Sequence, residues 1–123
     1  MKATVTSIAP NGEGQLVVSL ATDYGTLVGH WDGSLPQPSS TVHVELEFIP
    51  ESINAESENA SYSAKSPFPS GVLLVGVAES WSNGVLFLKV GPSLVQVECM
   101  DERASGRWLA VRGHALRFFD TNL

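Results

Sequence analysis

The stretch Thr41-Val42-His43-Val44-Glu45-Leu46-Glu47-Phe48 decides the fold class of this chain. Apolar and polar residues alternate along it, and successive side chains of a β-strand point to opposite faces. A period of two is typical of a strand with one buried and one solvated face. The stretch therefore predicts a strand whose apolar side chains enter a core and whose other side chains, His43, Glu45 and Glu47, face solvent.

The same pattern continues on both sides of this stretch. Val, Thr and aromatic residues fill the apolar runs, and Gly, Asn and Pro separate them. Asn11-Gly12 and Asn83-Gly84 supply residues that accept the positive φ of tight hairpins. We predict an all-β fold, a single-domain antiparallel barrel or sandwich of about eight to nine short strands. The further strands are expected at 2–8, 15–22, 26–31, 71–80, 85–90, 94–99, 107–112 and 115–119.

A long connection, residues 50–70, separates two groups of strands. It is rich in Ser, Pro and Glu and has no apolar period, and connections longer than about 12–15 residues are uncommon inside compact domains. A short helix over 51–60 is one expectation for it. Two more detailed architectures fit the pattern: an OB-like barrel, which also carries a long insertion, and an internal duplication that relates residues 4–49 to residues 73–119.

The composition is that of one globular domain spanning residues 1–123. Hydrophobic residues make up 43% of the chain and charged residues 16%, which excludes a disordered tail and a coiled coil. No apolar stretch approaches the roughly 20 residues of a membrane-spanning helix, and the first residues lack the apolar segment of a secretory signal. Together with a single cysteine, these features predict a cytoplasmic protein that does not associate with membranes.

Acidic residues dominate the first half of the chain. The net charge is −6, and residues 1–60 hold eight acidic residues and one basic residue. Nucleic-acid binding relies on clustered Lys and Arg, so this excess argues against a nucleic-acid partner. An acidic surface speeds the encounter with basic proteins, because the two electrostatic potentials are complementary. We therefore expect a basic protein partner.

No residue pattern indicates catalysis. Cys99 is expected to point inward, without the electropositive surroundings that a thiol nucleophile needs. His30, Asp32 and His43 are residue types that bind metals, but surface polar residues explain them better and no metal site is predicted. No Ser lies in a nucleophile elbow, and no Gly-rich phosphate motif is present. We predict that the protein is not an enzyme and uses no cofactor.

The predicted binding site combines an acidic strand face with one aromatic residue. Trp31 is expected to anchor the partner, because Trp is enriched at the centre of interfaces. The charged and polar residues expected around it are Asp32, His43, Glu45 and Glu47. The predicted function is a binding domain that holds a basic protein, most concretely an inhibitor of the immunity or antitoxin type.

Two other expectations remain open. Trp31 and Trp108 both lie next to turns, and indoles at the mouth of a β-barrel can stack a small ligand or an oligosaccharide. Residues 72–78 and 85–90 are largely apolar on both faces of their strands. Because large apolar patches are rarely exposed to water, we expect the outer face of this second half to pack against something. Either another part of the chain or a second copy, in a homodimer, could provide this contact.

Overall fold

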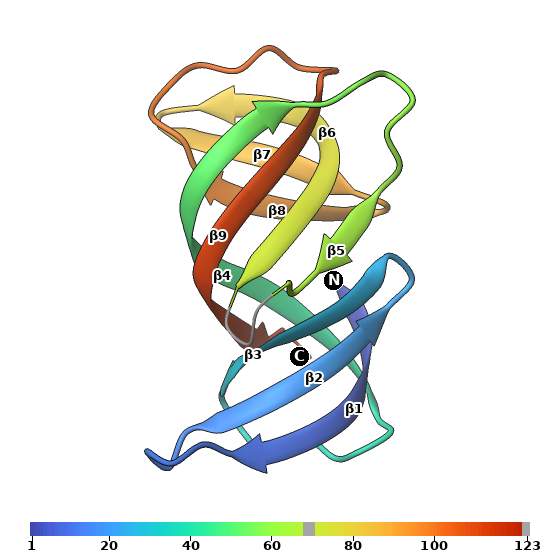
Figure 1. Ribbon diagram of the computed structural model, residues 1–123, viewed down its shortest axis with the longest axis vertical. Coiled ribbons are helices and arrows are strands. Elements are labelled where there is room, and N and C mark those ends of the chain that lie inside the picture. Colours follow the sequence, from blue (N-terminus) through green and yellow to red (C-terminus); the bar gives the residue numbers. More distant parts are fainter. Residues whose placement is uncertain (68–70, 122–123) are drawn as a thin grey trace.

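The computed structural model describes residues 1–67 and 71–121, and within them it contains strands and no helix. No helix in this part of the chain could therefore cross a membrane. Nine strands form one sheet (Figure 1), which confirms the all-β class and differs from the two sheets of a sandwich. In chain order the strands are β1 (Lys2–Pro10), β2 (Leu16–Thr22), β3 (Gly25–Asp32), β4 (Thr41–Ala55), β5 (Ser63–Lys65), β6 (Val72–Ser82), β7 (Val85–Val90), β8 (Ser93–Glu98) and β9 (Trp108–Asp120).

Five strands form a closed ring of pairings. The order is β1-β2-β3-β9-β4, and β4 pairs with β1 again. All these pairings are antiparallel except that of β3 with β9, which joins residues 30–32 to residues 117–119 in parallel. Phe118 lies at this junction and is completely buried. The parallel contact therefore both closes the ring and packs part of the core.

The other strands extend the same sheet as an open arc. From β9 the order continues to β6, β7 and β8, and β5 pairs with the start of β6. β4 and β9 are the longest strands, with 15 and 13 residues, and they run through both halves of the molecule (Figure 1). The ring and the arc thus share the β4–β9 pair.

β4 is longer than its sequence pattern predicts. The alternation ends at Phe48, yet the strand continues to Ala55, and residues 52–55 pair with residues 109–112 of β9. The helix expected over 51–60 is therefore wrong, because the ladder with β9 holds this segment extended. Residues 63–65 of the expected connection form β5, and residues 68–70 lie outside the described residues.

β9 combines two strands that the sequence predicts separately, at 107–112 and 115–119. A bulge replaces the expected turn at Gly113-His114: Ala115 has a φ of 57°, and the register of β4 against β9 shifts nearby. A β-bulge bends a strand and increases its twist without ending it. The bulge therefore allows one strand to serve both the ring and the arc.

Turn chemistry differs between the two Asn-Gly sequences. Asn83 and Gly84 have φ values of 50° and 81° and connect β6 to β7 in a tight hairpin, as predicted. The turn between β1 and β2 is longer. There the Asn11 side-chain oxygen accepts hydrogen bonds from the backbone N–H groups of Glu13 and Gln15, at 2.9 and 3.0 Å. This asparagine organises a loop rather than a two-residue turn.

The outer apolar face of the arc is partly buried. On β6, the side chains of Leu73, Val75 and Val77 alternate with buried residues and are themselves half-buried rather than exposed. β5 runs beside this part of β6, where Ser63 pairs with Val75. The chain itself thus removes part of this face from solvent, and the homodimer through it stays a prediction.

Closure of the ring depends on a glycine in β3. A Cβ on Gly29 would lie 2.7 Å from the Leu116 carbonyl oxygen and 3.1 Å from the Phe118 ring. We expect Gly29→Ala to lower the free energy of unfolding by about 1–3 kcal/mol, the usual cost of overpacking a core. Urea denaturation measures this loss. Gly12→Ala is the matched control, because nothing lies within 4 Å of a Cβ at that position. Equal stability of the two variants would contradict the tight β3–β9 contact.

Candidate functional site

A groove lies between β4 and the outer edge of β8. Its volume is about 360 Å³. The walls come from the first half of β4 and from β8, with single residues of β7, β9 and the start of the chain. Glu45 and Glu47, the acidic pair singled out from the sequence, both line it. The groove therefore joins the predicted acidic face to a strand from the second half of the chain.

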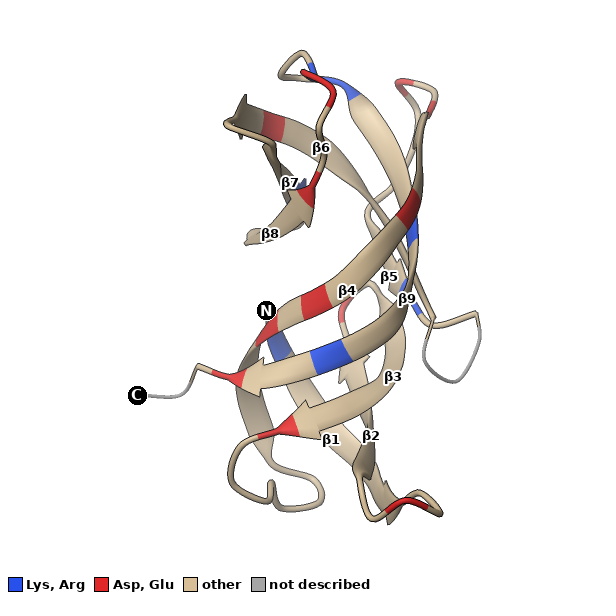
Figure 2. Cartoon of the chain, turned by 90° about the vertical axis from the view of Figure 1, so that its left-hand side faces the viewer, with Lys and Arg blue, Asp and Glu red and all other residues tan. Residues whose placement is uncertain are grey.

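Three carboxylates surround this groove. Glu45 and Glu47 come from β4, Glu98 comes from the end of β8, and all three residues are exposed. Figure 2 shows acidic bands on β4 and at the end of β8, on the two sides of the opening. The groove is lined by no Lys or Arg from the described part of the chain. Three carboxylates against one amino group, that of Met1, give the lining an excess of negative charge, which suits a cation.

The Met1 amino group lies at one end of the groove and marks where the β1–β4 ladder ends. It donates a hydrogen bond to the Val44 carbonyl oxygen at 2.6 Å, and the Val44 N–H donates to the Met1 carbonyl oxygen at 2.8 Å. Burial lowers the pKa of this amino group, and the Glu45 carboxylate opposes that effect. Beyond Val44, no described strand pairs with this edge of β4. The groove opens at this point.

The groove also has an apolar component. Leu46 and Val95 are 9% and 4% exposed and form part of its floor, whereas Leu94 is 58% exposed. Lys and Arg carry hydrocarbon stems that pack on apolar surface while their charged ends reach polar groups. An exposed leucine among carboxylates therefore suits long basic side chains in particular.

Trp31 does not belong to this site. Its side chain is 8% exposed, and its indole N–H donates a hydrogen bond to the Ser34 carbonyl oxygen at 2.8 Å. Trp31 pairs with Phe118, and Phe118 pairs with Leu46, so these residues share the inner face of the ring. Glu45 points to the opposite face. The expectation of an exposed Trp31 beside the carboxylates is therefore wrong, and Leu94 is the exposed apolar residue next to them.

Asp32 and His43 lie on the outer face but outside the groove. Asp32 accepts a hydrogen bond from the Arg117 guanidinium at 3.0 Å, and both side chains are about half exposed. Arg117 also lies opposite Glu47 in the β4–β9 register. His43 is exposed and lies opposite Lys2. Since cations interrupt the acidic residues on this face, the groove is its most consistently acidic part.

The two tryptophans of the alternative site are far apart. Trp31 lies beside the end of β9 and Trp108 begins that strand, which separates them by about 30 Å along the strand. They therefore do not form one ligand site. Trp108 instead lies against Tyr62, with 5.0 Å between ring centroids, and Tyr62 lies 5.8 Å from Tyr24. These three half-buried rings form an aromatic cluster.

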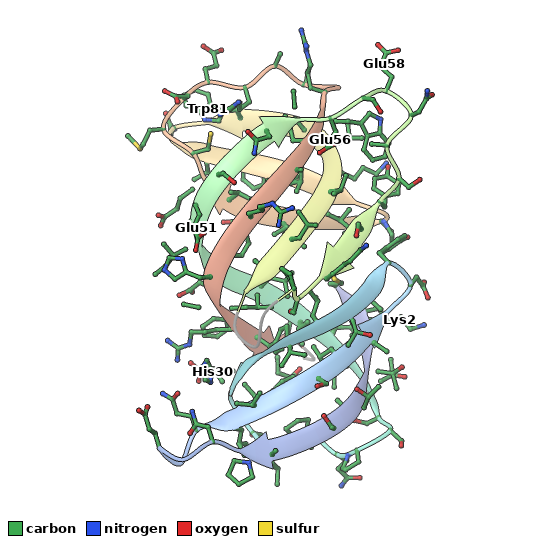
Figure 3. All side chains as sticks on the ribbon, viewed as in Figure 1. Lys2, His30, Glu51, Glu56, Glu58 and Trp81 are labelled. Carbon is green, nitrogen blue, oxygen red and sulfur yellow. The ribbon has the colours of Figure 1, made fainter. Side chains whose placement is uncertain are left out.

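Cys99 occupies a structural position. It is 6% exposed, as the strand pattern predicts, and its thiol donates a hydrogen bond to the Asp101 carbonyl oxygen at 3.1 Å. The Cys99 carbonyl oxygen accepts a hydrogen bond from the indole N–H of Trp81 at 2.8 Å. Figure 3 shows Trp81 in the upper half of the molecule and His30 in the lower half. In the described ranges, no three His, Cys, Asp or Glu residues are grouped as metal ligands.

Sequence reasoning missed the contribution of β8 to the site. Alternation along residues 94–99 predicts that Gln96 and Glu98 face outward, and both are exposed. It does not predict that β8 lies beside β4, because that contact depends on the order of strands in the sheet. The similar strand and turn spacing in the two halves of the chain is the one sequence signal that bears on that order.

Comparisons of this chain with models of protein families, with curated proteins and with solved structures find no match. The groove is therefore the feature from which a function can be inferred.

The three groove carboxylates make few interactions within the chain. Within the described residues, Glu47 and Glu98 make no hydrogen bond or ion pair, and Glu45 interacts only with the Met1 amino group. We expect the triple variant Glu45→Gln, Glu47→Gln and Glu98→Gln to change the free energy of unfolding by less than about 1 kcal/mol, as for other exposed positions. Urea denaturation tests this. A larger loss would mean that these carboxylates have structural partners.

Proposed function

We propose that the protein is a non-enzymatic binding domain whose groove between β4 and β8 holds a basic segment of a partner protein. The observation that carries this proposal is the lining of the groove, where Glu45, Glu47 and Glu98 meet an exposed leucine and no basic side chain. Charged residues arranged in this way steer a partner of opposite charge and fix its orientation. The apolar floor adds contact area for its side chains.

An inhibitor of a basic protein is the most concrete form of this function. Immunity and antitoxin proteins act on a toxin that reaches or is made in the cytoplasm, and a net charge of −6 favours rapid capture of a cationic toxin. No catalytic machinery is needed, because occupying the partner's surface is sufficient. Such an inhibitor would work in the cytoplasm.

The strand order supports a more specific description of the fold. We infer that the ring β1-β2-β3-β9-β4 is OB-like, since OB folds are five-stranded Greek-key barrels. OB folds often carry an insertion between their third and fourth strands, whereas here the inserted strands β5 to β8 lie between β4 and β9, the fourth and fifth strands of the ring. An OB-like ring fits a binding function without specifying the ligand, and the acidic groove disfavours nucleic acid.

The electrostatic part of the proposal predicts how association responds to charge. We expect Glu45→Lys combined with Glu47→Lys to slow association with the natural partner by about tenfold or more at low salt, because steering raises association rates by about 10–10³-fold. For wild-type protein, association should slow as salt is added. The partner is first isolated from the native host with immobilised protein, and association rates are then measured by surface plasmon resonance.

The matched control is Glu13→Lys combined with Glu58→Lys, which makes the same change in net charge at exposed positions outside the groove. It should retain most of the wild-type rate. Equal slowing by both pairs would mean that net charge alone drives association. An acidic partner, or rates unaffected by reversal at Glu45 and Glu47, would reject the proposal.

The aromatic cluster favours a second candidate, binding of a small ligand or an oligosaccharide. Tyr24, Tyr62 and Trp108 are only half-buried, and sugars stack on such rings. This candidate predicts that oligosaccharides change the tryptophan fluorescence of the wild-type protein but not of Trp108→Phe. Glycan-array screening followed by fluorescence titration distinguishes the candidates, because the groove variant Glu45→Lys, Glu47→Lys should bind a glycan normally.

A further inference from the structure

The strand pairings repeat between the two halves of the molecule. β1, β2 and β3 form an antiparallel meander whose first strand pairs with β4, and β6, β7 and β8 form one whose first strand pairs with β9. β4 and β9 pair with each other between the two meanders. The third strands, β3 and β8, therefore occupy equivalent positions in the two halves. β3 runs in the same direction as β9, and β8 runs in the same direction as β4. The halves differ in what the third strand contacts.

In the first half, the outer edge of β3 is covered. Its end pairs with β9, and the rest is bonded to the segment that contains β5. The Ala64 N–H donates to the Tyr24 carbonyl oxygen at 3.1 Å, and the Ser66 N–H donates to the Thr26 carbonyl oxygen at 3.0 Å. The Ser66 hydroxyl oxygen also accepts a hydrogen bond from the Val28 N–H at 2.7 Å. An extended segment of the chain thus occupies this edge.

In the second half, the corresponding edge of β8 is open. Gly25 and Ser93 are each the first paired residue after a two-residue turn, so Leu94 and Gln96 correspond to Thr26 and Val28. In an antiparallel hairpin, alternate residues direct their backbone groups away from the partner strand. The N–H and C=O groups of Leu94, Gln96 and Glu98 therefore point outward, and β8 pairs only with β7 among the described strands.

The open edge borders the acidic groove. All three of these outward-directed residues line it, opposite Glu45 and Glu47 of β4. Exposed edge strands are usually protected by Pro, Lys or a bulge. β8 contains neither Pro nor Lys, and its ladder with β7 has no register shift. The edge is therefore able to accept another strand.

We propose that the groove receives its partner by strand addition: an extended basic segment of the partner protein hydrogen-bonds to the outer edge of β8. This inference rests on the proposed function, since it names how the basic partner is held. β5 supplies the precedent within the same molecule, because it is an extended segment held at the corresponding edge. In strand addition, backbone hydrogen bonds provide affinity and alternate side chains provide specificity.

The side chains of the groove define the chemistry of this segment. Successive residues of a strand point to opposite sides, so one set of side chains faces the carboxylates of Glu45, Glu47 and Glu98 and the other set does not. Lys or Arg at alternate positions would place positive charges in the set that faces these carboxylates. β5 itself has a buried alanine, Ala64, followed by an exposed lysine, Lys65. The occupant is thus a strand with Lys or Arg at every second position and small or apolar residues between them.

A synthetic peptide with alternating Lys and Val, blocked at both ends and as long as the 6-residue β8, is the probe. Two further peptides carry backbone N-methyl groups. The first is methylated at every Lys, and the second is methylated at every Val. N-methylation removes hydrogen-bond donors and leaves the charge unchanged. Since a strand presents alternate N–H groups to each side, we expect one methylated peptide to bind about tenfold or more weakly and the other to bind like the parent.

Gln96→Pro tests the protein side of the same contact. The Gln96 N–H points away from β7, and proline is tolerated at edge positions where no ladder bond is lost. We expect Gln96→Pro to weaken binding of the parent peptide by about tenfold, whereas the control Gln96→Thr should bind this peptide like wild type. In ¹⁵N-labelled wild-type protein, the amide protons of Leu94, Gln96 and Glu98 should exchange more slowly once the peptide is bound. If Gln96→Pro does not fold, binding of the methylated peptides and the amide exchange rates still test whether the peptide pairs with β8.

The outcomes separate this inference from the proposed function. If both methylated peptides bind like the parent, and the triple glutamine variant binds none of them, the acidic groove holds basic segments but strand addition is overturned. If the triple variant binds the parent peptide as well as wild type does, both proposals fail. If the protein dimerises without peptide and Gln96→Pro abolishes the dimer, a second copy occupies the edge and the inference is overturned.

Discussion

The pairing of β4 with β9 is the constraint on which the rest of the structure depends. It is the only pairing that belongs to both the ring and the arc of the described strands. β4 must be long enough to meet β1 at one end and the first half of β9 at the other. The bulge at Ala115 then bends the pair, and the buried residues of both halves form one continuous core. The ring, the arc and the groove between β4 and β8 all follow from this shared ladder.

The alternation in residues 41–48 was sufficient to predict which side chains of β4 face solvent. Val42, Val44 and Leu46 are buried, and Glu45 and Glu47 are exposed. The same rule places Trp31 on the inner face, because β3 alternates in phase with Phe118 of β9. Alternation along β3, in which Leu27 and Trp31 are in phase, was already compatible with a buried Trp31. The expectation of an exposed indole came from the position of Trp31 next to a turn.

The remaining differences have one physical cause, which is that long-range pairing overrides local preference. Residues 51–55 have no clear strand pattern, yet they are extended because β9 offers them a ladder. In the same way, Gly113-His114 has the composition of a turn but becomes part of a bulged strand. Glu98 joins Glu45 and Glu47 only because the meander β6-β7-β8 curls back toward β4. Sequence reasoning could identify each strand and the exposed face of each, but it could not determine which edges meet.

The two halves carry different charges at their third strands. In the ring, Asp32 at the end of β3 meets Arg117 of β9, so opposite charges accompany closure. In the arc, the end of β8 carries Glu98, and the part of β4 across the groove carries Glu45 and Glu47. Like charges on neighbouring strands oppose pairing, and Arg117 of β9 lies opposite only one of these carboxylates, that of Glu47. A segment that brings its own Lys or Arg removes this repulsion and satisfies the open edge of β8 at the same time. The open edge of β8 thus lies among the carboxylates that, in the proposed binding mode, select a basic strand.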